Sequence, residues 1–331
     1  MSKRVMYIDL LRAIGIILMV LAHIPLANSF VHFVHGFHMP LFFVISGYLY
    51  YKGGYKHLFK TGKKLIVPYI SFSLIGYLLW VVEIKPESFN AMLTPIKSVL
   101  WINSSGMPIA GALWFLTAML FVNIMAYLLE TYFTGNILKA VVIVTIFVIG
   151  LLETTLFPFR FPWSFGASCV GLGYFYFGVI LNRCWDTKII SKLRQINILW
   201  YLAVMILVSF FIMQNGILNM RTGQYACIPI TVINSLIFIF VLWMLIYRIS
   251  FSIEHIADSV FIRELLKIGE YSIIYLCCNE LVINVTKSVL GKIGIDNLFV
   301  ITCLVFVLLK ICEKIILLRP FNFMIGQTVK K

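Results

Sequence analysis

The sequence predicts an all-α, polytopic membrane protein, and three observations carry this prediction. Of the 331 residues, 61% are hydrophobic and only 12% are charged, whereas soluble domains have about 45–50% and about 25%. Apolar runs of about 20 residues, the length that crosses a bilayer, recur along the chain. A soluble protein of this size could not bury so much apolar surface. We therefore expect a single transmembrane domain over residues 1–331 and no soluble domain.

About ten transmembrane helices are expected, with uncertain boundaries around the segment "FPFRFPW". Of the 27 Lys and Arg residues, 18 fall on the side of the N-terminus, 6 on the other side and 3 inside the expected spans. Positive charge collects on the cytoplasmic side of membrane proteins, so both termini are predicted to be cytoplasmic. The expected spans are about 8–28, 36–52, 65–83, 113–133, 139–157, 163–182, 196–214, 228–249, 270–288 and 297–318.

Charge and cysteine content exclude several other classes of protein. The net charge of +14 does not indicate a nucleic-acid partner, because most Lys and Arg residues lie in short segments between apolar runs. The seven Cys residues form no CxxC pair, so neither a disulfide framework nor a metal site is expected. The first apolar run has no clear cleavage site for a signal peptide. The chain also lacks the internal repeat of many transporters.

The first expected span opens with charged residues and ends on a histidine. Ionisable groups near the bilayer centre cost roughly 2.5–3.5 kcal/mol. Arg12 and His23 are eleven residues apart, so on a helix they share one face, about 16.5 Å apart along its axis. Asp9 lies one turn before Arg12, within reach of an ion pair. The ordinary alternative is a snorkelling Arg12 and a core His23, but an ionisable residue inside a membrane is by default a functional hypothesis.

The second expected span begins with "HGFHMPLFFVISGYLY". His35 and His38 lie at its outer mouth, and Pro40 falls in the first turn, where a missing N–H costs little. Ser46 and Gly47 form a small, polar notch that allows close helix approach or access to a ligand. Solvation at the interface is the simpler interpretation of His35.

These residues carry a family resemblance. "YIDLLRAIGIILMVLAHI" followed by "GFHMPLFFVISGYLY" resembles the start of the membrane-bound acyltransferase family 3, bacterial integral-membrane O-acyltransferases. The family signature is an Arg, ten residues and a His in the first helix, here Arg12 and His23. Weaker similarity runs along the whole chain, in "KTGKKLIVPY", "ALWFL", "LNMRTGQYAC" and "IGEYSIIYLCCNELV".

The resemblance implies transfer of an acyl group, usually acetyl, from acyl-CoA to a hydroxyl group of a cell-surface or lipid-linked glycan. No cofactor is expected to be bound permanently, because acetyl-CoA is the donor substrate. The cytoplasmic basic segment, with Lys60, Lys63 and Lys64, attracts the phosphates of CoA. Arg12 is expected to hold a phosphate or polarise the thioester. The family usually has Arg in this basic segment, and Lys lacks the bidentate fork of Arg.

His23 is the expected acid/base group or acyl carrier, and Asp9 joins Arg12 and His23 as a catalytic candidate through its pairing with Arg12. Direct base catalysis needs fewer steps than an acetylated His23, and both routes stay open. His38, Ser46, Trp114 and Tyr225 are the expected acceptor-binding residues, although Trp114 and Tyr225 also fit an interfacial aromatic belt.

Two glutamates inside expected spans have no assigned role, and one position of the family pattern differs in this chain. Glu153 and Glu280 are expected to be buried polar partners. Many family members have a His just after the late Tyr-Leu pair, where this chain has Cys277, Cys278 and Asn279. Any role of that His cannot be carried over to this chain.

The expected location is the bacterial cytoplasmic membrane, crossed several times. The expected partners are membrane lipid, acyl-CoA and the glycan or lipid-linked saccharide acceptor, with a homo-oligomer or a partner from glycan biosynthesis also considered. Two other functions stay open: a transporter or flippase that exports a saccharide, and an inactive sensor or scaffold of the same fold. Turnover of acyl-CoA by the purified protein distinguishes the transferase from both.

Overall fold

The computed structural model describes residues 6–24, 27–101, 111–253 and 259–326, and most of these residues are helical. The elements of the first half are α1 (Met6–His23), α2 (Asn28–His35), α3 (His38–Tyr48), α4 (Tyr55–Ile84), α5 (Phe89–Trp101), η1 (Gly111–Leu113), α6 (Trp114–Tyr132), α7 (Asn136–Leu151), α8 (Glu153–Leu156), η2 (Pro162–Ser164) and α9 (Phe165–Cys184). Those of the second half are α10 (Lys188–Arg194), α11 (Ile198–Asn215), β1 (Leu218–Asn219), β2 (Gln224–Tyr225), α12 (Ile228–Ile253), α13 (Val260–Glu270), α14 (Ser272–Lys292), α15 (Leu298–Ile316) and η4 (Asn322–Ile325).

The predicted all-α, polytopic architecture is confirmed, and all ten predicted spans fall on helices. Among the described residues, eight helical segments are long and apolar enough to cross a membrane. The other two predicted spans correspond to α7, which has 16 residues, and to α15, which has 19. α15 carries Lys310, Glu313 and Lys314, more charge than a typical span. The β1–β2 hairpin is a two-residue antiparallel pairing in the loop after α11.

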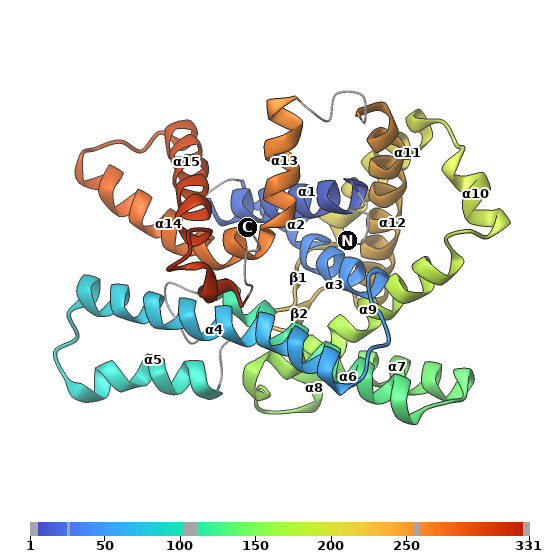
Figure 1. Ribbon diagram of the computed structural model, residues 1–331, viewed down its shortest axis with the longest axis horizontal. Helices are drawn as coiled ribbons and strands as arrows, with labels where there is room; N and C mark the ends of the chain where they lie inside the picture. Colours follow the sequence, from blue (N-terminus) through green and yellow to red (C-terminus); the bar gives the residue numbers. More distant parts are fainter. Residues whose placement is uncertain (1–5, 25–26, 102–110, 254–258, 327–331) are drawn as a thin grey trace.

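Two parts of the chain differ from the expected spans and loops. The segment between the expected spans 65–83 and 113–133 contains α5, which runs back beside α4 as a helical hairpin, drawn in cyan in Figure 1. A short helix, α2, precedes the expected second span and is separated from α3 by Gly36 and Phe37. Pro40 lies in the first turn of α3, as predicted, where its lack of an N–H leaves no hydrogen bond unmade.

α1 occupies the middle of the helical assembly, as Figure 1 shows in dark blue. It packs against α2, α3, α12, α13 and α14, and most of its side chains are buried. α13 approaches it very closely, because a Cβ added at Gly269 would lie 1.9 Å from the carbonyl oxygen of Asp9. The helix that carries Arg12 and His23 is therefore held on several sides by protein.

α3 and α9 cross in close contact through two glycines. A Cβ at Gly47 would lie 1.8 Å from the carbonyl oxygen of Phe175, and one at Gly178 would lie 2.0 Å from that of Val44. Small residues allow membrane helices to bring their backbones together. The notch at Ser46 and Gly47 therefore serves close helix approach on the Gly47 side, and Ser46 faces a pocket described below.

Candidate active site

Arg12 and His23 belong to one unbroken helix. α1 runs from Met6 to His23, so the predicted separation of about 16.5 Å along one face holds. The guanidinium of Arg12 lies 3.4 Å from Asp9 Oδ1, which confirms the predicted pair. Asp9 is only 6% exposed, so a charge partner is required at this depth. The pair orients Arg12 at one end of α1, while His23 closes the other end.

Two neighbouring pockets lie along this helix. The arginine pocket is a cavity of about 460 Å³ lined by residues that include Arg12 and Ser46. The histidine pocket has about 100 Å³ and includes His23 and His38. Leu276 of α14 lines both. The two ends of the Arg12–His23 face thus open into separate spaces that share one leucine side chain as a wall.

Hydrogen bonding fixes the orientation of the His23 ring. Its Nδ1 lies 2.8 Å from the carbonyl oxygen of Met19, and a carbonyl oxygen can only accept. Nδ1 therefore carries the proton, and in the neutral imidazole the lone pair is on Nε2. Nε2 lies 3.6 Å from Oε1 of Glu280. The ring presents a basic nitrogen to the histidine pocket, beside a carboxylate.

Glu280 of α14 connects His23 to two other segments. Its Oε2 accepts a hydrogen bond from the backbone N–H of Gly111, and its Oε1 lies 3.8 Å from the guanidinium of Arg221. Glu280, expected to be a buried polar partner, has polar partners, and its side chain is 15% exposed. A carboxylate held by a backbone donor and a cation stays fixed relative to Nε2 of His23.

Two further histidines line the same pocket. His38 is 4% exposed, and its Nδ1 lies 2.8 Å from the carbonyl oxygen of Val34, so its Nε2 is also the free ring nitrogen. The rings of His35 and His38 stack with their centroids 5.3 Å apart. His35 lines the pocket, so it is more than an interfacial side chain. Imidazole and aromatic faces of this kind can contact the hydroxyl groups and rings of a sugar.

The loop that carries Arg221 is tied down by a second buried carboxylate. Glu153 is 2% exposed and pairs with Arg160 at 3.3 Å, which confirms the prediction of a buried polar partner. Arg160 donates to the carbonyl oxygens of Thr222, at 2.7 Å, and Arg221, at 3.1 Å. Arg160 therefore holds the backbone of the β1–β2 loop next to the histidine pocket.

The arginine pocket combines cationic, polar and apolar side chains. Ser46, His57 and Lys64 line it with Arg12, and Glu270 of α13 supplies one carboxylate. Lys60 and Lys63 are exposed on the first turns of α4 and do not line the pocket. Of the three predicted lysines, only Lys64 reaches the pocket, whereas the other two contribute charge near its rim.

Of the two aromatic residues predicted to bind the acceptor, one lines the histidine pocket and the other does not. Trp114 begins α6, is 6% exposed and lines the histidine pocket. Tyr225 lies on β2 and lines neither pocket. Burial raises the pKa of its hydroxyl, and the neighbouring hydroxyl of Tyr174 raises it further. Tyr225 thus belongs to the polar cluster around Arg160 and Glu153 rather than to the histidine pocket.

Sequence reasoning assigned no role to Glu280 and overlooked Arg221 and Asn219, which also lines the histidine pocket. These residues are far from His23 in the chain. The signals available were a glutamate inside an apolar run and the family-like segment "LNMRTGQYAC", which contains Asn219 and Arg221. Within the described parts of the chain, no three His, Cys, Asp or Glu side chains are placed to hold a metal ion.

Comparison with protein families gives a match over most of the chain. The family model described as an acyltransferase domain matches residues 5–312, nearly the whole chain, and this range includes every residue of the two pockets. Searches of curated proteins and of solved structures found no match.

Proposed function

The chain belongs to acyltransferase family 3, and on this premise we propose that it transfers an acyl group, acetyl in the first instance, from acyl-CoA to a hydroxyl group of a cell-surface or lipid-linked glycan. The observation that carries the proposal is the pair of pockets on one face of α1, which meet at Leu276. One pocket has the cationic groups that an anionic donor needs, and the other has the base that an acceptor needs.

The arginine pocket is the proposed donor site. CoA is anionic, and Arg12 and Lys64 line a cavity of about 460 Å³. Lys60 and Lys63, exposed nearby on α4, attract the phosphates from solution. The pantetheine arm extends along α1 from Arg12 toward His23, so that the thioester reaches Leu276. Asp9 holds the guanidinium of Arg12 in place through their ion pair.

The histidine pocket is the proposed site of transfer. Nε2 of His23 removes the proton from the acceptor hydroxyl as its oxygen attacks the thioester carbonyl. The C–S bond breaks, and the imidazolium returns the proton to the CoA thiolate. Glu280, 3.6 Å from Nε2, stabilises the imidazolium while it exists. General acid–base catalysis of this kind contributes about 10²- to 10⁴-fold to the rate.

An acyl-histidine route uses the same atoms in two steps. Nε2 of His23 attacks the thioester itself, CoA leaves, and the acceptor hydroxyl then takes the acyl group from the ring. We favour direct transfer because it has fewer steps. Acetylated His23 trapped in the absence of acceptor would reverse this preference.

The acceptor is proposed to lie among His38, Trp114 and Ser46. His38 and Trp114 line the histidine pocket with His23, and an aromatic face and fixed ring nitrogens suit a sugar hydroxyl. Ser46 lines the donor pocket instead and is proposed to contact the substrate where the two pockets meet. Tyr225 lies outside both pockets, and its proposed role is acceptor binding at the β1–β2 hairpin.

The proposed location is the bacterial cytoplasmic membrane with both termini in the cytoplasm. The proposed partners are membrane lipid, acyl-CoA and the acceptor glycan, with a second copy or a glycan-biosynthesis protein as a further partner. The charge bias of 18 to 6 Lys and Arg between the two sides supports this orientation.

The test is turnover of acetyl-CoA by the purified, reconstituted protein. Release of CoA that increases when acceptor glycan is added is the expected result. Mass analysis of surface glycans from a deletion strain should show loss of one acetyl group per modified sugar and so name the acceptor. A protein that moves saccharide without CoA release would be a transporter and would refute the proposal.

A further inference from the structure

The proposed transfer develops negative charge on one oxygen of the thioester. As the acceptor oxygen bonds to the carbonyl carbon, the electron pair of the C=O bond moves onto the carbonyl oxygen. Enzymes that transfer acyl groups stabilise this oxyanion with fixed hydrogen-bond donors, usually the largest single contribution to the rate. His23 acts as the base and the Glu280 carboxylate only accepts hydrogen bonds, so neither side chain supplies that stabilisation.

Arg12 lies too far from His23 to stabilise this oxyanion. The two side chains leave α1 eleven residues apart, about 16.5 Å along its axis. An oxyanion donor must lie about 2.7–3.1 Å from the oxygen, and the base must lie about 2.6–3.2 Å from the attacking hydroxyl. Both oxygens are bonded to the same carbon. The donor must therefore lie beside the base, in the histidine pocket, and not at the other end of α1.

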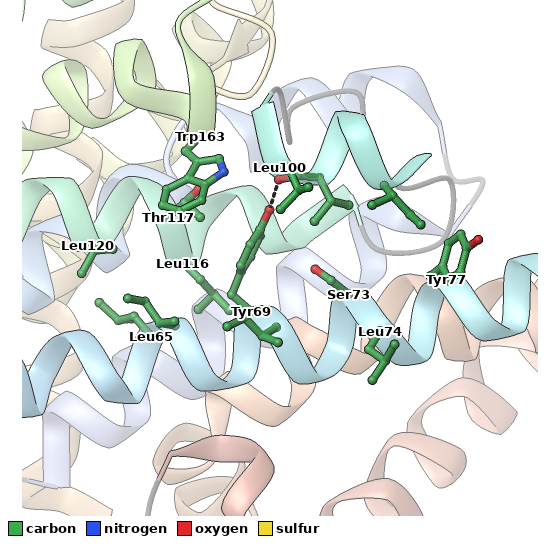
Figure 2. Close-up of a pocket in the computed structure, with 14 residues that line it drawn as sticks. Leu65, Tyr69, Ser73, Leu74, Tyr77, Leu100, Leu116, Thr117, Leu120 and Trp163 are labelled. Carbon is green, nitrogen blue, oxygen red and sulfur yellow. Dashed lines mark hydrogen bonds between the residues drawn. The ribbon is translucent and has the colours of Figure 1, made fainter. Parts of the chain in front are cut away.

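The cavity on the far side of the donor pocket has no suitable donor either. It has about 490 Å³ and lies between α4, α5 and α6, and Figure 2 shows its mainly apolar lining. The hydroxyl of Tyr69 in this cavity already donates to the carbonyl oxygen of Val99, at 2.7 Å. Among the described residues that line it, none is a Lys or an Arg. This cavity is therefore unsuited to stabilising an oxyanion.

Arg221 is a cation beside the proposed base. Among the described residues that line the histidine pocket, it has the one side chain that always carries a positive charge, with five N–H donors. Its Nη1 lies 3.8 Å from Glu280 Oε1, and Nε2 of His23 lies 3.6 Å from the same oxygen. The two nitrogens are therefore at most 7.4 Å apart, the sum of these two distances. Base and guanidinium are close enough to act on one carbon, through the attacking oxygen and the oxyanion respectively.

The backbone around Arg221 is held by hydrogen bonds within the protein. Arg160 donates to the carbonyl oxygens of Thr222, at 2.7 Å, and of Arg221, at 3.1 Å. The N–H of Thr222 donates to Oδ1 of Asn219 at 3.3 Å, and β1 pairs with β2 on either side of this turn. Donors that are fixed in advance need no reorganisation when charge develops on the substrate.

Gly111 makes room for the guanidinium. A Cβ at Gly111 would lie 2.4 Å from Nη1 and 2.6 Å from Nη2 of Arg221. The absence of a side chain therefore allows the guanidinium to lie against the backbone of η1. The N–H of Gly111 also donates to Glu280 Oε2. One short segment thus places both the carboxylate and the guanidinium next to His23.

We propose that Arg221 is a catalytic residue that stabilises the oxyanion of the tetrahedral intermediate. Its guanidinium donates to the former carbonyl oxygen while Nε2 of His23 holds the proton of the acceptor hydroxyl. As the C–S bond breaks, the electron pair returns to the C=O bond, and the CoA thiolate takes the proton from the imidazolium. In the acyl-histidine route the same oxyanion stabilisation applies to both steps. The inference rests on the proposed acyl transfer and adds an electrophilic group to its site.

Steady-state kinetics of the reconstituted full chain test the proposal. The substrates are radiolabelled acetyl-CoA and the surface-glycan fraction from a deletion strain, which lacks the modification. Arg221→Gln should lower kcat about 100- to 1000-fold, the effect of removing one oxyanion donor, with little change in either KM. Millimolar guanidinium should restore part of kcat to Arg221→Ala, and Arg221→Lys should retain more activity than Arg221→Gln because it keeps a cationic donor. Arg183→Gln, at a side chain that is 62% exposed and outside both pockets, should match the wild type.

A double-variant comparison separates oxyanion stabilisation from support of Glu280. Arg221 neighbours Glu280, so its removal also changes the surroundings of that carboxylate. Stabilisation of the oxyanion predicts that Arg221→Gln lowers kcat by at least about 10-fold further in a Glu280→Gln background. Gly111→Ala keeps the N–H for Glu280 but displaces the guanidinium, so it should lower kcat as Arg221→Gln does. It carries the same test if a thermal unfolding scan shows that Arg221→Gln does not fold.

Three results would overturn the proposal. An unchanged kcat in Arg221→Gln would remove Arg221 from the reaction. A raised KM for the glycan fraction with unchanged kcat would make Arg221 an acceptor-binding residue. Equal kcat in Glu280→Gln and the double variant would make it a positioning residue for Glu280. Absence of CoA release by the wild-type protein in the same assay would count instead against the proposed function.

Discussion

Nε2 of His23 lies 3.6 Å from Oε1 of Glu280, while Nδ1 of the same ring faces the carbonyl oxygen of Met19 at 2.8 Å. One ring nitrogen is thus occupied by the backbone of α1, and the other is directed at a carboxylate from α14. The pairing joins helices that are far apart in the sequence and gives the proposed base a fixed direction.

Glu280→Gln should lower kcat for acyl transfer about 10- to 100-fold with little change in the KM for acetyl-CoA. The variant keeps the hydrogen-bond acceptor for the Gly111 N–H but removes the negative charge that stabilises the imidazolium. Such a charge contributes a few kcal/mol at most to transition-state stabilisation. Steady-state kinetics measure kcat and KM separately. Glu130→Gln, which alters a carboxylate paired with Lys139 outside both pockets, is the control, and equal losses in the two variants would contradict the assignment.

Arg12→Lys should raise the KM for acetyl-CoA about 10-fold or more while the protein stays folded. Lys keeps the charge and its attraction to Asp9, but it lacks the planar fork that binds a phosphate or carbonyl at two points. Kinetics with acetyl-CoA and direct binding of CoA both report the change. Arg183→Lys, at a side chain that is 62% exposed, should have no effect. Unchanged CoA affinity in Arg12→Lys would remove Arg12 from the donor site.

Leu276→Phe should block transfer and leave CoA binding intact, because Leu276 is the side chain that both substrate pockets share. Leu276 is 4% exposed, so the larger ring also strains the core by about 1–3 kcal/mol. Leu276→Ala removes the same wall without overpacking and should retain transfer. If Leu276→Phe binds CoA and transfers acetyl at the wild-type rate, the thioester does not pass this residue.

Gly47→Ala should destabilise the protein by about 1–3 kcal/mol or more, because its Cβ would lie 1.8 Å from the backbone of Phe175 and overpacking forces helices apart. Gly291→Ala is the matched control on α14, with nothing within 4 Å of its added Cβ. A helix-interior Gly→Ala change is otherwise stabilising by about 0.5–1 kcal/mol. Thermal unfolding in detergent compares the midpoints of Gly47→Ala and Gly291→Ala. Equal midpoints for the two variants would contradict the close crossing of α3 and α9.

Acid should weaken the contact between α13 and α15. Hydrogen bonds from Lys267 and Lys310 lower the pKa of Glu264 from 4.5 to about 2, with N–O distances of 2.8 Å and 2.7 Å. A lowered folded-state pKa means that the stabilisation is present above pH 4.5 and is lost as pH falls toward about 2. Unfolding midpoints should fall over this window in the wild type and fall less in Glu264→Gln. Parallel curves would show that Glu264 does not contribute.

Much of the fold could be predicted because the length of an apolar run can be read directly from the sequence. Each of the ten predicted spans lies on a helix. α5 and α13 could not be predicted in this way, since they have 13 and 11 residues, too few to cross a bilayer, and are amphipathic. Their helices depend on packing against α4 and α1, which sequence periodicity does not show.

The candidate site was predictable where its residues share a helix. The periodicity of α1 brings Arg12, His23 and Asp9 to one side without any tertiary information. Glu280 reaches His23, and Arg221 reaches Glu280, only through tertiary folding of α14 and the β1–β2 loop. Neither the glutamate in an apolar run nor the segment "LNMRTGQYAC" shows this proximity. The sequence also could not show which lysine borders the donor pocket: Lys64 lines it, whereas Lys60 and Lys63 do not.

Acetyl transfer by reconstituted wild-type protein and by His23→Ala tests the central claim most directly. Radiolabelled acetyl-CoA is supplied with acceptor glycan, and both CoA release and label in the glycan are counted. Wild-type protein should give both, as should His32→Ala, whose histidine lies on α2 and lines neither substrate pocket. His23→Ala should lose at least about 100-fold of each, in line with loss of a general base. Wild-type rates of glycan labelling in His23→Ala would contradict the account.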